Sequence, residues 1–228
     1  MEEHLLDIPI VDSHNDQSLY SFLAKGISDI HLNPRSERPV TDYIYLQSVV
    51  SKLTKPYDLS QFTLLHQYPE TSQRNTPYYY PSPYQDIYDN LHDYLTDHLE
   101  EIAQNILSND KNHLMDAYLD AWELYNEAAV RVDHILNQVN ATWIESHISG
   151  GIRELFHIHT LHCVKWQQLV WSRVCGLVVD GVQKAMQESY QYATDMLRLM
   201  ERFRSQTVGQ IWDEVDERTK IYQDRYKG

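Results

Sequence analysis

The sequence predicts an all-α protein, and three observations support that prediction. All eight Pro lie at or before Pro83, so the 145 residues after it contain no residue that breaks a helix interior. No Gly occurs between Gly26 and Gly150. No run rich in Val, Ile and Thr alternates between apolar and polar residues, as a β-strand would. Apolar residues instead recur three and four positions apart, which is the period of an α-helix that buries one face.

The strongest helical pattern fills residues 110–171. Its two halves meet at Ser149-Gly150-Gly151, which predicts a helix C-cap and a turn, because Gly adopts positive φ without steric cost. A helix before this break and a second helix over residues 151–171 should therefore fold back on one another. The residues of their apolar stripes should be buried together: Trp122, Tyr125, Val132, Leu136, Phe156, Cys163 and Trp166.

Three helices are expected before this pair. The first should start at Asn15 or Asp16 and end near residue 31, and the second should run from a Thr41 cap to about residue 53. The second helix carries Ile44 outside its main apolar stripe, so it has a side left to bind or to bury. Residues 55–83, rich in Tyr and Pro, should form a long loop. A third helix should then begin at Ser82 or Tyr84 and end near residue 107.

Charge and composition exclude several classes of function. The formal net charge is −14, and residues 84–148 hold 13 Asp or Glu against 2 Lys or Arg, which argues against a nucleic-acid groove. These acidic residues indicate either solvated helix faces or a negative surface that meets a basic partner. No apolar run reaches the roughly 18–20 residues of a membrane span, and the start of the chain does not resemble a signal peptide. With only two Cys, we expect a cytoplasmic and/or nuclear protein without a disulfide framework.

The histidine-rich segment His157–Cys163 is the one candidate for metal chemistry. His159 and Cys163 are four residues apart and could share a helix face. No second Cys/His cluster accompanies them, and both fit an apolar stripe, where a small hydrophobe and a core His are common. Nucleophile-elbow and phosphate-loop motifs are also missing from the sequence. We therefore expect no catalytic residue, no cofactor and no bound metal.

Five segments stand in an order and spacing that indicate a family. They are Leu19-Tyr20-Ser21-Phe22-Leu23, Thr41-Asp42-Tyr43-Ile44-Tyr45-Leu46-Gln47, Tyr88-Asp89-Asn90-Leu91-His92-Asp93-Tyr94-Leu95, Ala121-Trp122-Glu123-Leu124-Tyr125, and the segment from Leu155 to Trp166. Together they resemble the N-terminal repeat of cullins, the elongated scaffolds of multi-subunit ubiquitin ligases. The likeness covers about residues 16–175. Its last segment is similar to fungal cullins that use a Skp-type adaptor.

This resemblance implies a partner and a set of contact positions. In cullins a BTB-fold, Skp-type adaptor sits on the second helix and on the C-terminal end of a later long helix. The matching positions here are Tyr43, Ile44, Leu46, Gln47, Val50, Asn137, Gln138 and Ala141. Gln47, Gln138 and Ala141 replace a Tyr, a Tyr and an Arg of the family pattern, and such residues are typical interface hot spots. The resemblance therefore implies weakened adaptor binding.

The expected architecture is a cullin-repeat-like multi-helix bundle with a helical C-terminal extension. Residues 1–14 should form a flexible lead-in, residues 15–178 the first repeat, and residues 179–228 the start of a second repeat. No RING protein is an expected partner, because the cullin domain that binds it finds no match in these 228 residues. Three hypotheses stay open: an adaptor-binding scaffold, a diverged structural protein that has lost the adaptor site, and an enzyme built on the histidine-rich helix.

Overall fold

The described part of the chain is entirely helical, as the sequence predicts. The computed structural model describes residues 16–55, 82–110, 113–152 and 155–188, and no strand occurs in these ranges. The α-helices are α1 (Asp16–Leu32), α2 (Val40–Leu53), α3 (Pro83–Leu107), α4 (Leu114–Ile135), α5 (Glu145–Ser149), α6 (Ile158–Trp166) and α7 (Ser172–Glu188). Two π-helical segments, η1 (Val139–Ile144) and η2 (Gln167–Trp171), follow α4 and α6. The predicted lead-in 1–14, most of the loop 55–83 and the segments after residue 188 lie outside the described residues.

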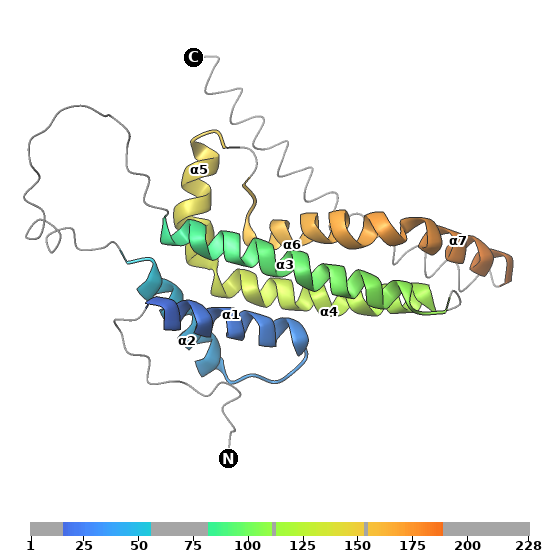
Figure 1. Ribbon diagram of the computed structural model, residues 1–228, viewed down its shortest axis with the longest axis horizontal. Helices are drawn as coiled ribbons and strands as arrows, with labels where there is room; N and C mark the ends of the chain where they lie inside the picture. Colours follow the sequence, from blue (N-terminus) through green and yellow to red (C-terminus); the bar gives the residue numbers. More distant parts are fainter. Residues whose placement is uncertain (1–15, 56–81, 111–112, 153–154, 189–228) are drawn as a thin grey trace, which may run out of the picture.

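The helices form a bundle built around α3 and α4 (Figure 1). These two run antiparallel through its middle, with α6 and α7 along one side and α1 and α2 on the other. The short α5 projects away from the bundle at the end where α3 begins. The helix α6 contacts α4, so the two central segments fold back on one another as predicted.

The starts of the first three helices follow from local sequence, with one correction. The helix α1 begins at Asp16, and α3 begins at Pro83, where Pro fits because the first helical N–H has no partner within the helix. The predicted Thr41 cap is wrong: α2 begins at Val40 after Pro39, so Thr41 lies inside the first turn. With Pro39 as the N-cap, the helix begins two residues earlier than it would after a side-chain cap at Thr41.

The core contains the predicted stripe residues with one exception. Trp122, Tyr125 and Trp166 are buried and their rings touch, with centroids 5.1–6.3 Å apart. Val132, Leu136 and Cys163 are buried in the same core. Phe156 was also expected there but is only half-buried, because it precedes α6 instead of lying on its stripe.

The turn at the glycine pair is confirmed, but the helix predicted directly after it is wrong. Gly151 has φ of 96°, and the N–H of Ile152 bonds to the His147 carbonyl at 3.1 Å, which closes the end of α5. The next helix begins only at Ile158. The intervening stretch has apolar residues at helical spacing, yet it carries no regular structure where it is described.

Two side chains from elsewhere in the chain explain why α6 begins at Ile158. Asn140 Oδ1 accepts from the Ile158 N–H at 2.9 Å, and Asp133 Oδ1 accepts from the His159 N–H at 3.1 Å. Asn140 Nδ2 also donates to Asp133 Oδ1 at 2.9 Å, which holds the two capping groups together. The first N–H groups of α6 are therefore satisfied from α4 and η1, and Asp133 adds negative charge at the N-terminus of the helix.

Candidate partner-binding surface

Some of the predicted contact residues of α2 lie in the core, and others lie on the surface. Leu46 and Val50 are 1% and 0% exposed, so their side chains belong to the core of this domain. Ile44 is 58% exposed, and Gln47, three residues later on the same side of the helix, is exposed as well. One turn before Ile44, Val40 is 72% exposed, which extends the apolar part of this outer face. Of the predicted α2 residues, only Tyr43, Ile44 and Gln47 have side chains that a partner could reach.

The C-terminal end of α4 presents a second exposed stripe. Val130, His134 and Asn137 are exposed and lie four and three residues apart, so they share one side of the helix. Ala141 follows in η1 and is exposed as well. The sequence analysis selected Asn137 and Ala141 but missed Val130, which is 42% exposed. The sequence hint for Val130 is its position: it directly follows the buried pair Ala128-Ala129 and therefore turns away from the buried side of the helix.

Hydrogen bonds join these two stripes into one surface. Gln47 Nε2 donates to the His134 carbonyl at 3.1 Å, and Ser51 Oγ donates to Gln138 Oε1 at 2.7 Å. Sequence positions 87 residues apart are thus side by side, as the resemblance implied. We call the surface made of the exposed residues the α2–α4 face; its members are Val40, Ile44, Gln47, Val130, His134, Asn137 and Ala141.

Gln138 lies beneath this face and points into the domain. Its Nε2 donates to Thr54 Oγ1 at 3.0 Å and to the Tyr84 hydroxyl at 3.4 Å, while its Oε1 accepts from Ser51. One amide therefore links the end of α2, the start of α3 and the segment after α4. Gln138 is half-buried, so its role here is to hold the helices together.

Tyr43 is fixed by the charged residues of α4. Its hydroxyl accepts from Arg131 Nη1 at 3.2 Å, and its ring packs against the core. Arg131 also pairs with Glu127 at 2.7 Å, and Arg35 pairs with Glu123 and Glu127 at 3.3 and 3.6 Å. These ion pairs border the α2–α4 face near the start of α2. Tyr43 is therefore half-buried and held in one position before any partner arrives.

A cluster of buried imidazoles is the only group with strongly shifted histidine pKa values among the described residues, and it lies apart from this face. His162 Nδ1 lies 2.7 Å from the Ile158 carbonyl and must donate to it, which leaves Nε2 to accept from His31 Nε2 at 3.4 Å. Burial lowers the pKa of His162 to about 4 and holds the pKa of His31 well below its ordinary value. Both rings are thus neutral near pH 7. The sequence analysis placed His159 in the core, whereas the fully buried residue is His162.

His159 and Cys163, the pair weighed as metal ligands and not expected to bind a metal, lie in different surroundings. Cys163 is buried in the core, while His159 is half-buried with its Nε2 3.3 Å from Asn126 Oδ1. Within residues 16–55, 82–110, 113–152 and 155–188, no three His, Cys, Asp or Glu side chains converge as metal ligands. Over the same ranges, no helix is long and apolar enough to cross a membrane.

Comparison with known proteins agrees with this arrangement of helices. No curated protein matches the sequence significantly. A family model does match it: the model described as the cullin alpha solenoid domain aligns with residues 22–227, which is most of the chain. The order of the helices, the contact between α4 and α6 and this match lead to one conclusion: the chain belongs to the cullin family.

Proposed function

We propose that this chain, as a member of a family of ubiquitin-ligase scaffolds, binds a BTB-fold, Skp-type adaptor through the α2–α4 face. The observation that supports this most directly is the pair of hydrogen bonds from Gln47 and Ser51 to the segment around Gln138. They join α2 to the end of α4, the two regions that the resemblance implies for adaptor contact, and Ile44 is exposed beside them. The role would be that of a scaffold without catalytic chemistry of its own, acting in the cytoplasm or nucleus.

The apolar residues of the face can supply the binding energy. The apolar side chains of Val40, Ile44 and Val130 are 72%, 58% and 42% exposed to solvent. Covering them with a partner removes apolar surface from water, at roughly 25 cal/mol per Å². An anchor at the centre of an interface typically contributes about 2 kcal/mol or more. Ile44 is the best candidate for such an anchor.

The three positions that depart from the cullin pattern differ in their exposure to solvent. Gln47 and Ala141 are exposed, so the loss of a Tyr and an Arg there removes direct contacts. Gln138 faces inward, so replacing it by the family Tyr would break its bonds to Ser51, Thr54 and Tyr84. We therefore expect weak binding that Ala141→Arg improves and that Gln138→Tyr does not.

Calorimetric titration of a purified Skp-type adaptor into the chain tests the proposal. The double variant Val40→Ala/Ile44→Ala should weaken binding about 10–100-fold, as expected for the loss of interface anchors. A matched control, Leu177→Ala, removes an exposed apolar side chain from α7 and should leave binding unchanged. Circular dichroism should show all variants folded.

The alternative is a diverged helical protein that has kept the fold and lost the adaptor site. The inward position of Gln138 favours this alternative, because a residue from the implied contact set now serves the interior. If no BTB-fold adaptor binds at concentrations near 100 μM, roughly a −5 kcal/mol affinity, the alternative replaces the proposal.

A further inference from the structure

A groove lies between α1 and α3, on the side of α1 away from α2. It encloses about 520 Å³ and is lined by residues 17–27 of α1 and 86–94 of α3. Within α1, Phe22 and Gly26 face Tyr45 and Leu46 of α2. The groove residues Tyr20 and Ala24 lie on the opposite side of the same helix. The groove is therefore separate from the α2–α4 face.

The floor of this α1–α3 groove is apolar and its rim is acidic on one side only. Core side chains form the floor: Leu23, Ile27, Ile87 and Leu91. Two half-buried tyrosines, Tyr20 and Tyr94, stand beside them. The α3 rim carries Asp86 and Asp89, whereas the α1 rim carries the neutral Gln17 and Ser21.

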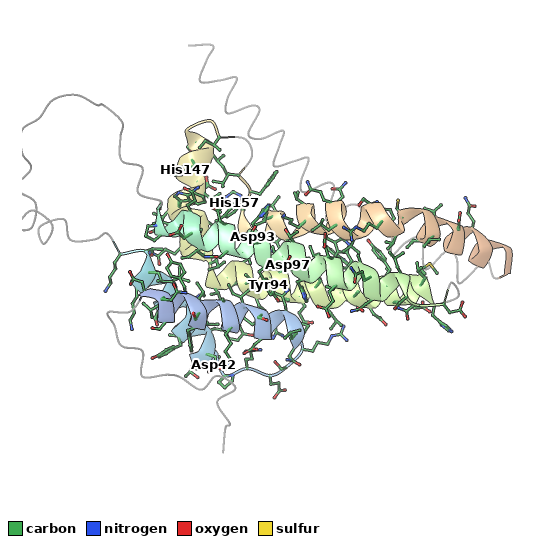
Figure 2. The ribbon with its side chains drawn as sticks, viewed as in Figure 1. Asp42, Asp93, Tyr94, Asp97, His147 and His157 are labelled. Carbon is green, nitrogen blue, oxygen red and sulfur yellow. The ribbon has the colours of Figure 1, made fainter. Side chains whose placement is uncertain are left out.

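The negative charge of the α3 rim extends along the helix, and it is compensated only in part, by the Arg173–Glu100 ion pair and by Lys165 near Asp93. The helix contains six Asp or Glu and no Lys or Arg. Among the described residues no ion pair reaches Asp86, Asp89 or Asp97. Figure 2 shows Asp93 and Asp97 along α3, with Tyr94 on the side of α1. Like charges this close favour a cationic occupant at the rim.

The dimensions of the groove fit one kind of occupant. Residues 86–94 and 17–27 extend over about 12 and 15 Å of helix at 1.5 Å per residue. Three apolar anchors at i, i+3 or i+4, and i+7 of a docked helix span about 10 Å, which is the usual mode of helix-in-groove binding. We propose that the α1–α3 groove binds an amphipathic helix of another protein, with three apolar anchors and Lys or Arg along the flank that faces Asp86 and Asp89.

A fluorescent helical peptide of about 18 residues, with Leu at i, i+4 and i+7 and Lys on one flank, tests this in the intact chain. Anisotropy should show binding of this peptide. A peptide with Glu in place of Lys, and one with the Leu order scrambled, should bind at least about tenfold more weakly. Binding should also weaken as NaCl rises, because salt screens the rim charges.

Variants of the chain locate the site. Asp86→Asn/Asp89→Asn should weaken binding of the Lys peptide about tenfold. The control Asp120→Asn/Asp180→Asn removes the same charge from exposed positions of α4 and α7 and should have little effect. Ala24→Trp should fill the groove and abolish binding, whereas Ala141→Trp, on the α2–α4 face, should not. Thermal unfolding checks that each variant is folded.

Several results would overturn the inference. The peptide could fail to bind the wild-type chain, bind equally with Glu in place of Lys, or keep its affinity in Asp86→Asn/Asp89→Asn or Ala24→Trp. Sedimentation could instead show a dimer that Ala24→Trp dissociates, in which case the occupant is a second copy of this chain. None of these results depends on whether the adaptor binds the α2–α4 face.

Discussion

Trp166 packs against three other rings of the aromatic core. Its ring centroid lies 5.7, 5.2 and 5.1 Å from those of Tyr118, Trp122 and Tyr125, and its Nε1–H donates to the Tyr118 hydroxyl at 3.1 Å. Trp166→Ala should therefore lower the free energy of unfolding by about 3–5 kcal/mol. Urea unfolding followed by circular dichroism measures it, and a loss below about 1 kcal/mol would show that the site collapses without cost.

Gly26 is required by the contact between α1 and α2. A Cβ at this position would lie 2.5 and 3.0 Å from the two methyl carbons of Leu46, which is only 1% exposed and has no room to move. Gly26→Ala should destabilise the domain by about 1–3 kcal/mol, although Ala is the better helix former. Gly176→Ala is the control, because no atom lies within 4 Å of its added Cβ. It should stabilise by up to about 1 kcal/mol in the same denaturation assay.

Burial of individual residues could be predicted where a helix packs one apolar stripe against the rest of the bundle. This held for Trp122 and Val132 on α4. It held only in part for α6: Cys163 and Trp166 are buried as predicted, but His162 is buried too, because α6 is covered by α4, by α3 and by His31 of α1. A hydrophobic pattern counts His as polar, and the partner that makes His162 a core residue lies 131 positions earlier. Sequence periodicity contains no information on that distance.

At the scale of elements, the remote cap of α6 predicts a specific loss. Removing the Asn140 side chain leaves the Ile158 N–H buried without its acceptor and frees Asp133 from its amide partner. Asn140→Ala should lower the free energy of unfolding by about 1–3 kcal/mol. Asn137→Ala removes an exposed amide one turn earlier and should change stability by less than about 0.5 kcal/mol. Equal effects of the two substitutions in thermal and urea unfolding would contradict the capping role.

The same cap shows which elements the sequence could define. The ends of α1 and α3 depend on residues inside or next to each helix, and both were predicted to within a residue or two. The start of α6 depends on groups 18 and 26 residues away, so the apolar spacing before it suggested a helix, whereas Ile152 and residues 155–157 are not helical. The same distinction between local and remote determinants applies to the candidate surface. Its exposed residues could be chosen by resemblance, but the inward direction of Gln138 depends on Thr54 and Tyr84.

At the scale of the whole molecule, the imidazole cluster joins four helices. His31 from α1 lies against Tyr94 and His98 from α3, Tyr125 from α4 and His162 from α6. Glu101 beside His98, and Asp133 and His159 beside His162, are the other titratable groups that act on it. Any change in the charge of this cluster therefore affects the packing of α1 against the rest of the bundle.

Acid should destabilise the fold through this cluster. The pKa of His162 is about 4 in the folded chain and near 6.5 when unfolded, so the unfolded chain binds more protons as pH falls below 6.5. Stability should then decrease between about pH 6.5 and 4, by about 3 kcal/mol from His162 alone, with His31 adding to the loss in the same direction. Urea midpoints at pH 7 and pH 5 measure the slope. His162→Phe should reduce it, and an unchanged slope would assign the acid sensitivity to other groups.

The remote capping of α6 also bears on how this domain can change in length. Because Asp133 and Asn140 fix where α6 begins, the connection after Gly151 does not set the register of the helix. An insertion after Ile152 that doubles the length of the connection should cost only about 0.6 kcal/mol of loop entropy. The position directly after Ile152 is thus a place where a relative could gain or lose residues, and where a tag or even new chain termini could be introduced, while the helices of the bundle keep their packing.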